Sequence, residues 1–131
     1  MRVLALDHGE ARCGCAISDP SGTIATPLPE VERPDSRAGL NRIAALVEEH
    51  GVERVVVGLP LTLAGERGEQ ASRVRVFAEA LQRRVSVEVE LHDERLTTRL
   101  AERTGGEAGA DSRAAAHLLE SWLARSAAAA E

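Results

Sequence analysis

The chain has 131 residues, of which 44% are hydrophobic and 28% are charged, and its formal net charge at pH 7 is −5. This length suits a single domain with one core. The acidic balance argues against a protein that coats nucleic acid nonspecifically, but it is compatible with a nuclease whose metal ligands are acidic. Because no apolar stretch approaches the ~20 residues of a membrane span and no signal-peptide pattern is visible, we expect a cytoplasmic protein without a membrane partner.

Three strands are predicted at the start of the chain. Residues Met1–Asp7 are apolar on both faces, which favours a central strand. Arg12–Ser18 and Thr23–Leu28 predict two further strands, and the turn residues 19–22 between them favour an antiparallel hairpin. A loop is expected from the end of the third strand onward, marked by Pro27, Pro29 and Pro34.

Helices and strands alternate in the rest of the chain. A helix should run from an N-cap at Ser36 to a C′ glycine at Gly51. The elements expected after it are a strand at Arg54–Gly58, a helix at about Glu69–Arg84, a strand at Val85–His92, a short helix at Leu96–Arg103 and a last helix from about Ser112 to Arg125. Residues 126–131 form an alanine-rich tail that we expect to be flexible, so the predicted domain covers residues 1–125.

The predicted order is βββαβαβα with one short extra helix after the fifth strand. A three-strand meander followed by alternating helices and strands implies an α/β fold, in which helices cover a mixed sheet. This order matches the element order of the ribonuclease H-like fold, in which the first strand is central. We therefore predict a five-stranded mixed sheet of order 3-2-1-4-5, flanked by helices.

Acidic residues lie at the ends of three predicted elements: Asp7, the pair Asp93-Glu94, and Asp111. Converging carboxylates repel each other unless a cation joins them, and a two-metal phosphodiester hydrolase uses that arrangement. Each acid also has a plainer interpretation. Asp7 and Gly9 match common turns and the phosphate-binding hairpin of actin-like ATPases, and Asp93, Glu94 or Asp111 can act as helix N-caps.

Arginines and glycines supply candidate phosphate contacts. The chain contains no lysine, and the planar guanidinium group of arginine suits bidentate phosphate contacts. Arg95, Arg99 and Arg103 recur every four residues and either follow a phosphate backbone or form a solvated stripe. The segment with Gly58 and Gly65 either presents N–H groups to a phosphate or is a plain strand-to-helix connection.

The cysteines and histidines give weaker signals. Cys13 and Cys15 are predicted to be buried small apolar residues, because they are too close in sequence for a good disulfide and lack a histidine pair for zinc. Among the histidines, His92 beside Asp93 is the one of interest, as a spectator or substrate contact more than as a general base.

Together these segments resemble the YqgF (RuvX) family of candidate Holliday-junction resolvases and pre-16S ribosomal RNA nucleases. The matching stretches are LALDHGEARCGCAISD, VVVGLPL, FAEAL, VELHDERLTT and DSRAAAHLLESWL, which occur in the family's order and cover nearly the whole chain. The chain departs from the family at Cys13 and Cys15, where aliphatic residues are usual. It also departs in the short acidic loop at residues 104–110, where relatives often carry lysines.

The resemblance implies a ribonuclease H-like nuclease domain with Mg²⁺ or Mn²⁺ as cofactor. The catalytic residues and metal ligands that it implies are Asp7, Glu94 and Asp111, with Asp93 as the alternative to Glu94. The nucleic-acid contacts expected with them are Arg12, Arg95, Arg99, Gly9, Gly58 and Gly65.

The expected function is metal-dependent hydrolysis of phosphodiester bonds, in processing the 5′ end of pre-16S rRNA. The first alternative is a Holliday junction resolvase that cuts branched DNA, normally as a two-fold dimer; whether this chain is a monomer or a homodimer stays open. A lesser alternative is a noncatalytic nucleic-acid-binding module. An ATP-binding protein of the actin-like class is disfavoured because that architecture needs two such domains.

Overall fold

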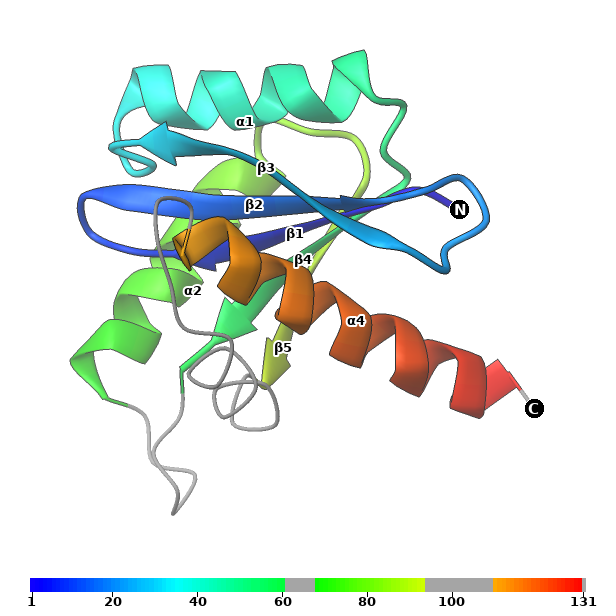
Figure 1. The fold of residues 1–131 in the computed structure, drawn as a ribbon. Coiled ribbons are helices and arrows are strands. Elements are labelled where there is room, and N and C mark those ends of the chain that lie inside the picture. Colours follow the sequence, from blue (N-terminus) through cyan, green and yellow to red (C-terminus); the bar gives the residue numbers. More distant parts are fainter. Residues whose placement is uncertain (61–67, 94–109, 131) are drawn as a thin grey trace.

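The computed structural model describes residues 1–60, 68–93 and 110–130, with only the backbone described at residues 110, 111 and 128–130. These residues form one five-stranded sheet with the order β3-β2-β1-β4-β5, and helices lie on both of its faces (Figure 1). The predicted α/β fold and strand order are therefore confirmed.

The first strand is central, as its apolar sequence predicts. The strands are β1 (Val3–His8), β2 (Arg12–Ser18), β3 (Ala25–Glu32), β4 (Arg54–Leu59) and β5 (Glu88–Asp93). β1 pairs antiparallel with β2 and parallel with β4, and β5 continues the sheet parallel to β4. The three parallel strands consequently end at one edge of the sheet.

Three described helices cover the sheet: α1 (Arg37–Glu49) and α2 (Glu69–Gln82) on one face, and α4 (Ala110–Ala130) on the other (Figure 1). Successive strand residues point to opposite faces, and β1 follows this rule. Leu4 and Leu6 pack in the α1/α2 core, whereas Val3 and Ala5 pack in the α4 core with Leu119. This alternation between the two cores determines which acidic residues lie on the same face of the sheet.

The ends of α1 follow the predicted signals. The Ser36 hydroxyl accepts a hydrogen bond from the Gly39 N–H at 3.0 Å, as an N-cap does. Gly51 has φ +61°, a left-handed conformation that glycine adopts without the Cβ penalty. Both predicted caps are confirmed.

The prediction of a loop at Pro27 and Pro29 was wrong, because both lie inside β3. β3 is an edge strand, so the missing proline N–H can face away from β2 without breaking the ladder. Pro27 pairs with Ala16 of β2. Pro34 does lie in a turn between β3 and α1.

Element boundaries also differ in the second half of the chain. β5 begins at Glu88 instead of Val85, because Glu88 is the partner of Arg54, the first residue of β4. α4 continues past Arg125 to Ala130, in keeping with the high helix propensity of alanine. The flexibility of residues 126–131 stays a prediction, and the short helix predicted at Leu96–Arg103 lies outside the described residues.

No helix in residues 1–60, 68–93 and 110–130 combines the length and hydropathy that crossing a membrane requires.

Candidate active site

The carboxyl edge of the parallel strands carries the predicted acidic residues. Asp7 is the next-to-last residue of β1, and Asp93 is the last residue of β5. Leu6 pairs with Val57, which in turn pairs with Leu91. Asp7 therefore lies one residue past this row, at the edge where open α/β sheets form their sites.

Asp7 belongs to the α4 face of the sheet. It alternates with Val3 and Ala5, which pack beneath α4, and it is half-buried. Its neighbour His8 lies on the other face, against Phe77 of α2. The carboxylate of Asp7 thus lies on the side of the sheet that carries the last predicted acid, Asp111.

Glycines flank Asp7 on both sides within the sheet. Gly14 of β2 pairs with Asp7, and Gly58 of β4 follows Val57, the partner of Leu6. Both glycines are buried, and neither has a side chain. The two strand positions next to Asp7 therefore contribute no side chain.

The first turn of α4 is attached to β2 next to Asp7. The buried hydroxyl of Ser112 accepts a hydrogen bond from the Cys15 N–H at 3.2 Å. Cys15 is the strand neighbour of Gly14, which pairs with Asp7. The backbone of Asp111 precedes Ser112 in α4, so the structure brings the start of α4 to the end of β1; the side chain of Asp111 lies outside the described residues.

Asp93 lies on the opposite face from Asp7. Within β5, Val89 and Leu91 pack against the α1/α2 core, and Asp93 alternates with them. His92 and Glu90 instead contact α4. Glu94 lies outside the described residues, so the structure describes only Asp93 of the two candidates.

The predicted nucleic-acid contacts are described only in part. Arg12 is exposed at the start of β2. Gly9 donates its N–H to the Arg12 carbonyl at 3.0 Å, and a Cβ at Gly9 would come within 2.7 Å of that oxygen. Gly9 is therefore required by the hairpin itself. The other predicted contacts, Gly65, Arg95 and Arg99, lie outside the described residues.

His92 faces α4 beside this edge. It pairs with Gly58 across β4 and β5, and its Nε2 lies 3.2 Å from the Ser121 hydroxyl. Burial, with a smaller contribution from the Arg125 charge, lowers the pKa of His92 below its ordinary value of 6.5. The lowered pKa does not separate a contact residue from a general base, so the role of His92 stays a prediction.

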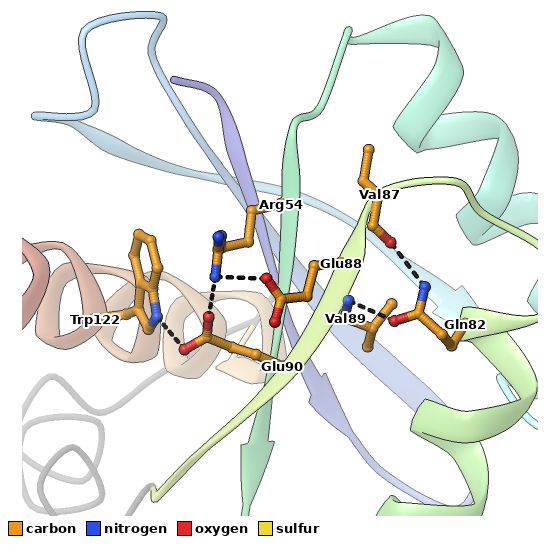
Figure 2. A network of polar contacts seen from close by, with 7 residues as sticks. All are labelled: Arg54, Gln82, Val87, Glu88, Val89, Glu90 and Trp122. Carbon is orange, nitrogen blue, oxygen red and sulfur yellow. Dashed lines mark hydrogen bonds and ion pairs between the residues drawn. The ribbon is translucent and has the colours of Figure 1, made fainter.

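A polar network attaches α4 to β4 and β5 (Figure 2). The Glu90 carboxylate accepts from Arg54 Nη1 at 2.5 Å and from Trp122 Nε1 at 2.8 Å. Arg54 also pairs with Glu88 at 3.1 Å, and its guanidinium lies 5.9 Å from the Trp122 ring centroid. Sequence reasoning missed this network. The sequence pattern that could have revealed it is the placement of Glu88 and Glu90 at alternate positions of a predicted strand, which gives the strand one polar face.

The two cysteines are buried and free, as predicted. Hydrogen bonding to Cys15 and burial raise the pKa of the Cys13 thiol well above its ordinary value, and the nearby charges of Asp7 and Asp35 raise it further. Cys13 is therefore a protonated core residue at neutral pH.

The described side chains contain no group of three His, Cys, Asp or Glu residues arranged to hold a metal ion. Two of the three predicted ligands, Glu94 and the side chain of Asp111, lie outside that set. The chemistry of the described donor fits a divalent cation, because Asp7 offers hard carboxylate oxygens of the kind that Mg²⁺ and Mn²⁺ prefer.

The family model described as "RuvX: Holliday junction resolvase" matches residues 1–125. This chain belongs to the RuvX family. A relative from Chloroflexus aurantiacus named "Putative pre-16S rRNA nuclease" is 51% identical over 100 residues, which are 76% of this chain and 65% of the relative. The chain thus spans slightly less than two thirds of that relative's length. A relative of the same name from Maridesulfovibrio salexigens is 41% identical over 134 residues, which cover 95% of this chain and 99% of the relative.

Solved resolvases share the fold of this RuvX chain at low sequence identity. The RuvC protein of T. thermophilus, in complex with a Holliday junction substrate, aligns with a TM-score of 0.64 and 14% identity over 96% of each chain. The fowlpox virus Holliday junction resolvase aligns with a TM-score of 0.56 and 11% identity, covering 95% of this chain and 99% of the viral one. At these identities the likeness concerns the fold alone.

Proposed function

We propose that this chain is a metal-dependent nuclease that hydrolyses phosphodiester bonds in processing the 5′ end of pre-16S rRNA. The observation that carries the proposal is the placement of Asp7. It lies at the carboxyl edge of the parallel strands, between Gly14 and Gly58, and beside the first turn of α4. Relatives at 41–51% identity are named "Putative pre-16S rRNA nuclease", which supports the choice of substrate.

Asp7, Glu94 and Asp111 would hold Mg²⁺ or Mn²⁺. We choose Glu94 over Asp93 because Asp93 lies on the α1/α2 face, opposite Asp7. Divalent cations held there would supply Lewis acidity for the attack of water and would neutralise charge at the scissile phosphate.

The other residues of the edge would bind and orient the substrate. Arg12 is exposed two residues before Gly14, so its guanidinium is available to a phosphate next to the one being cut. Gly9 would shape the hairpin that carries Arg12, since its N–H is committed to the Arg12 carbonyl. The phosphate contacts of Arg95, Arg99, Gly58 and Gly65 stay predictions.

A Holliday junction resolvase is the second candidate function. The description of the matching family model favours it, and the same metal chemistry would serve it. A junction resolvase aligns two sites in a two-fold dimer, so the oligomeric state in solution separates the two functions as well as the substrate does.

The test is cleavage of a 5′-extended 16S rRNA precursor and of a four-way DNA junction, side by side, with Mg²⁺ or Mn²⁺. We expect selective cutting of the RNA by the wild type. Asp7→Asn should abolish it while leaving the thermal unfolding midpoint of the metal-free protein unchanged. Glu53→Gln is a matched control, because Glu53 is exposed just before β4, at the opposite edge of the sheet.

Paired symmetric nicks in the junction, without cutting of the RNA, would establish the resolvase instead. Wild-type turnover in Asp7→Asn would refute the mechanism. If neither substrate is cut but RNA binding persists in the triple variant of Asp7, Glu94 and Asp111, the chain is a noncatalytic binding module.

A further inference from the structure

A carboxylate on a neighbouring loop holds the residue that follows Asp7. The His8 side chain is 3% exposed, and its ring centroid lies 4.7 Å from that of Phe77. Its Nε2 lies 2.9 and 3.0 Å from the two carboxylate oxygens of Asp35. Asp35 comes two residues before α1, so this contact ties the end of β1 to the α1 side of the sheet.

Burial alone does not require an imidazole at this position. A leucine would fill similar space against Phe77 without a polar partner, whereas a buried ring nitrogen is costly unless it is hydrogen-bonded. The Asp35 side chain is 55% exposed, so water can satisfy its carboxylate. What the pair adds over an apolar contact is a directional link between β1 and the segment before α1.

The hydrogen bond of His8 affects the direction of the Asp7 side chain, because neighbouring side chains leave a strand on opposite faces. A side chain held on one face fixes the rotation of the strand about its axis, and with it the direction of the next side chain. Within the described strands, the register of β1 with β4 ends at Leu6 and Val57, whereas its register with β2 continues to His8 and Cys13. The Asp35 contact therefore supports β1 past the point where the β4 ladder stops.

We infer that His8 and Asp35 form a positioning pair that aims the Asp7 carboxylate at the divalent cation. This inference rests on the proposed function, in which Asp7 binds that cation. His8 and Asp35 lie on the opposite face of the sheet, so they act through Asp7 and contact neither the cation nor the substrate. Loss of a residue that orients a metal ligand typically lowers metal affinity or activity by about 10-fold or more.

Two variants remove the link in different ways. Asp35→Ala deletes the acceptor, and His8→Leu deletes the imidazole while keeping an apolar contact with Phe77. Glu49→Gln is the matched control, because it removes a carboxylate from an ion pair with Arg42 at the other end of α1, where both side chains are 54% exposed.

The first measurement is Mn²⁺ affinity, from the electron paramagnetic resonance signal of free Mn²⁺ titrated into full-length protein. The second is cleavage, with kcat and KM determined separately. We expect both variants to weaken Mn²⁺ binding and to lower kcat by about 10-fold, with KM for the nucleic acid and the metal-free unfolding midpoint of His8→Leu close to wild type. Glu49→Gln should change none of these quantities.

Wild-type Mn²⁺ affinity in the folded variants would overturn the positioning role, whatever happens to cleavage. A loss of kcat that only follows a lower unfolding midpoint would overturn it too; if Asp35→Ala does not fold, His8→Leu decides. A wild-type protein that neither binds Mn²⁺ nor cuts nucleic acid would overturn the proposed function and this inference with it. A wild type that does both, with variants that match it, would overturn the inference alone.

Discussion

The polar network around Glu90 predicts that substituting two glutamates that contact the same arginine will lower the free energy of unfolding by very different amounts. Glu88 and Glu90 both pair with Arg54, but the Glu88 side chain is 62% exposed and the Glu90 side chain is 31% exposed. Glu90 also accepts from the buried indole N–H of Trp122. Replacing each glutamate by glutamine removes the charge and keeps the shape of the side chain.

In Glu90→Gln, one of the two oxygens becomes an NH₂ group, which faces an N–H donor of Arg54 or Trp122. A hydrogen bond to a charged group contributes about 1.5–3 kcal/mol, and a buried donor without an acceptor costs a similar amount. Because Glu90 is partly exposed, water replaces part of the loss, and we expect a cost near the lower end, about 1.5–2 kcal/mol. Glu88→Gln breaks an exposed ion pair and should cost less than about 0.5 kcal/mol.

The assay is urea unfolding followed by far-ultraviolet circular dichroism and by the fluorescence of Trp122, the one tryptophan in the chain. Coincident transitions would justify a two-state analysis, and an unchanged m-value would place the effect on the folded state. For a chain of this length, 1.5–2 kcal/mol corresponds to a decrease of roughly 5–8 °C in Tm. Equal costs for the two variants, or a cost below about 0.5 kcal/mol for Glu90→Gln, would refute the argument from burial.

Three further predictions concern the active-site edge and a distant turn. Asp93→Asn should keep nuclease activity and Glu94→Gln should lose it, because Asp93 lies on the face away from Asp7; loss of turnover in Asp93→Asn alone would reverse this assignment. Gly9→Ala should lower stability by about 1–3 kcal/mol in urea unfolding, because its Cβ would lie 2.7 Å from a backbone oxygen. Gly68→Ala, where no described atom outside the two adjacent residues lies within 4 Å of the new Cβ, should cost less. The Asp19 carboxylate accepts hydrogen bonds from the Ser21 hydroxyl and from the N–H groups of Ile24 and Thr23. These bonds hold the pKa of Asp19 well below its ordinary value of 3.8. The stability that Asp19 contributes is therefore present above about pH 4 and is lost as the pH falls further, so the gap in stability between wild type and Asp19→Asn should close on acidification and should not widen.

Local sequence signals predicted the sheet because each strand and each helix cap has a recognisable pattern within a few residues. A strand that is apolar on both faces must be covered on both, which placed β1 at the centre, and Ser36 and Gly51 marked the ends of α1. The loop prediction at the prolines of β3 was wrong because a proline nitrogen carries no hydrogen, and this costs stability only where the nitrogen faces another strand. Only the edge position of β3 answers that question.

The choice between Asp93 and Glu94 shows what strand alternation alone leaves undecided. Alternation states that the two residues lie on opposite faces, but it does not say which face α4 covers. The contacts of Glu90 with Trp122 and of His92 with Ser121 supply that missing fact, since they place the even-numbered residues of β5 beneath α4. These two contacts with α4 thus turn the alternation pattern into a functional assignment that can be tested.

The proposed acids of the site and the partners proposed to orient them differ in how far apart they lie in sequence. Asp7 is the next-to-last residue of β1 and Asp111 is the second residue of α4, so a local pattern reveals them. The contacts that join these elements to the rest of the fold link residues far apart: His8 and Asp35 are separated by 27 positions, Glu90 and Trp122 by 32, and Cys15 and Ser112 by 97. Each of these contacts pairs common residue types that carry no motif of their own. It follows that the chemistry of such a site can be predicted from one sequence, whereas the direction in which its carboxylates point must come from the packed structure.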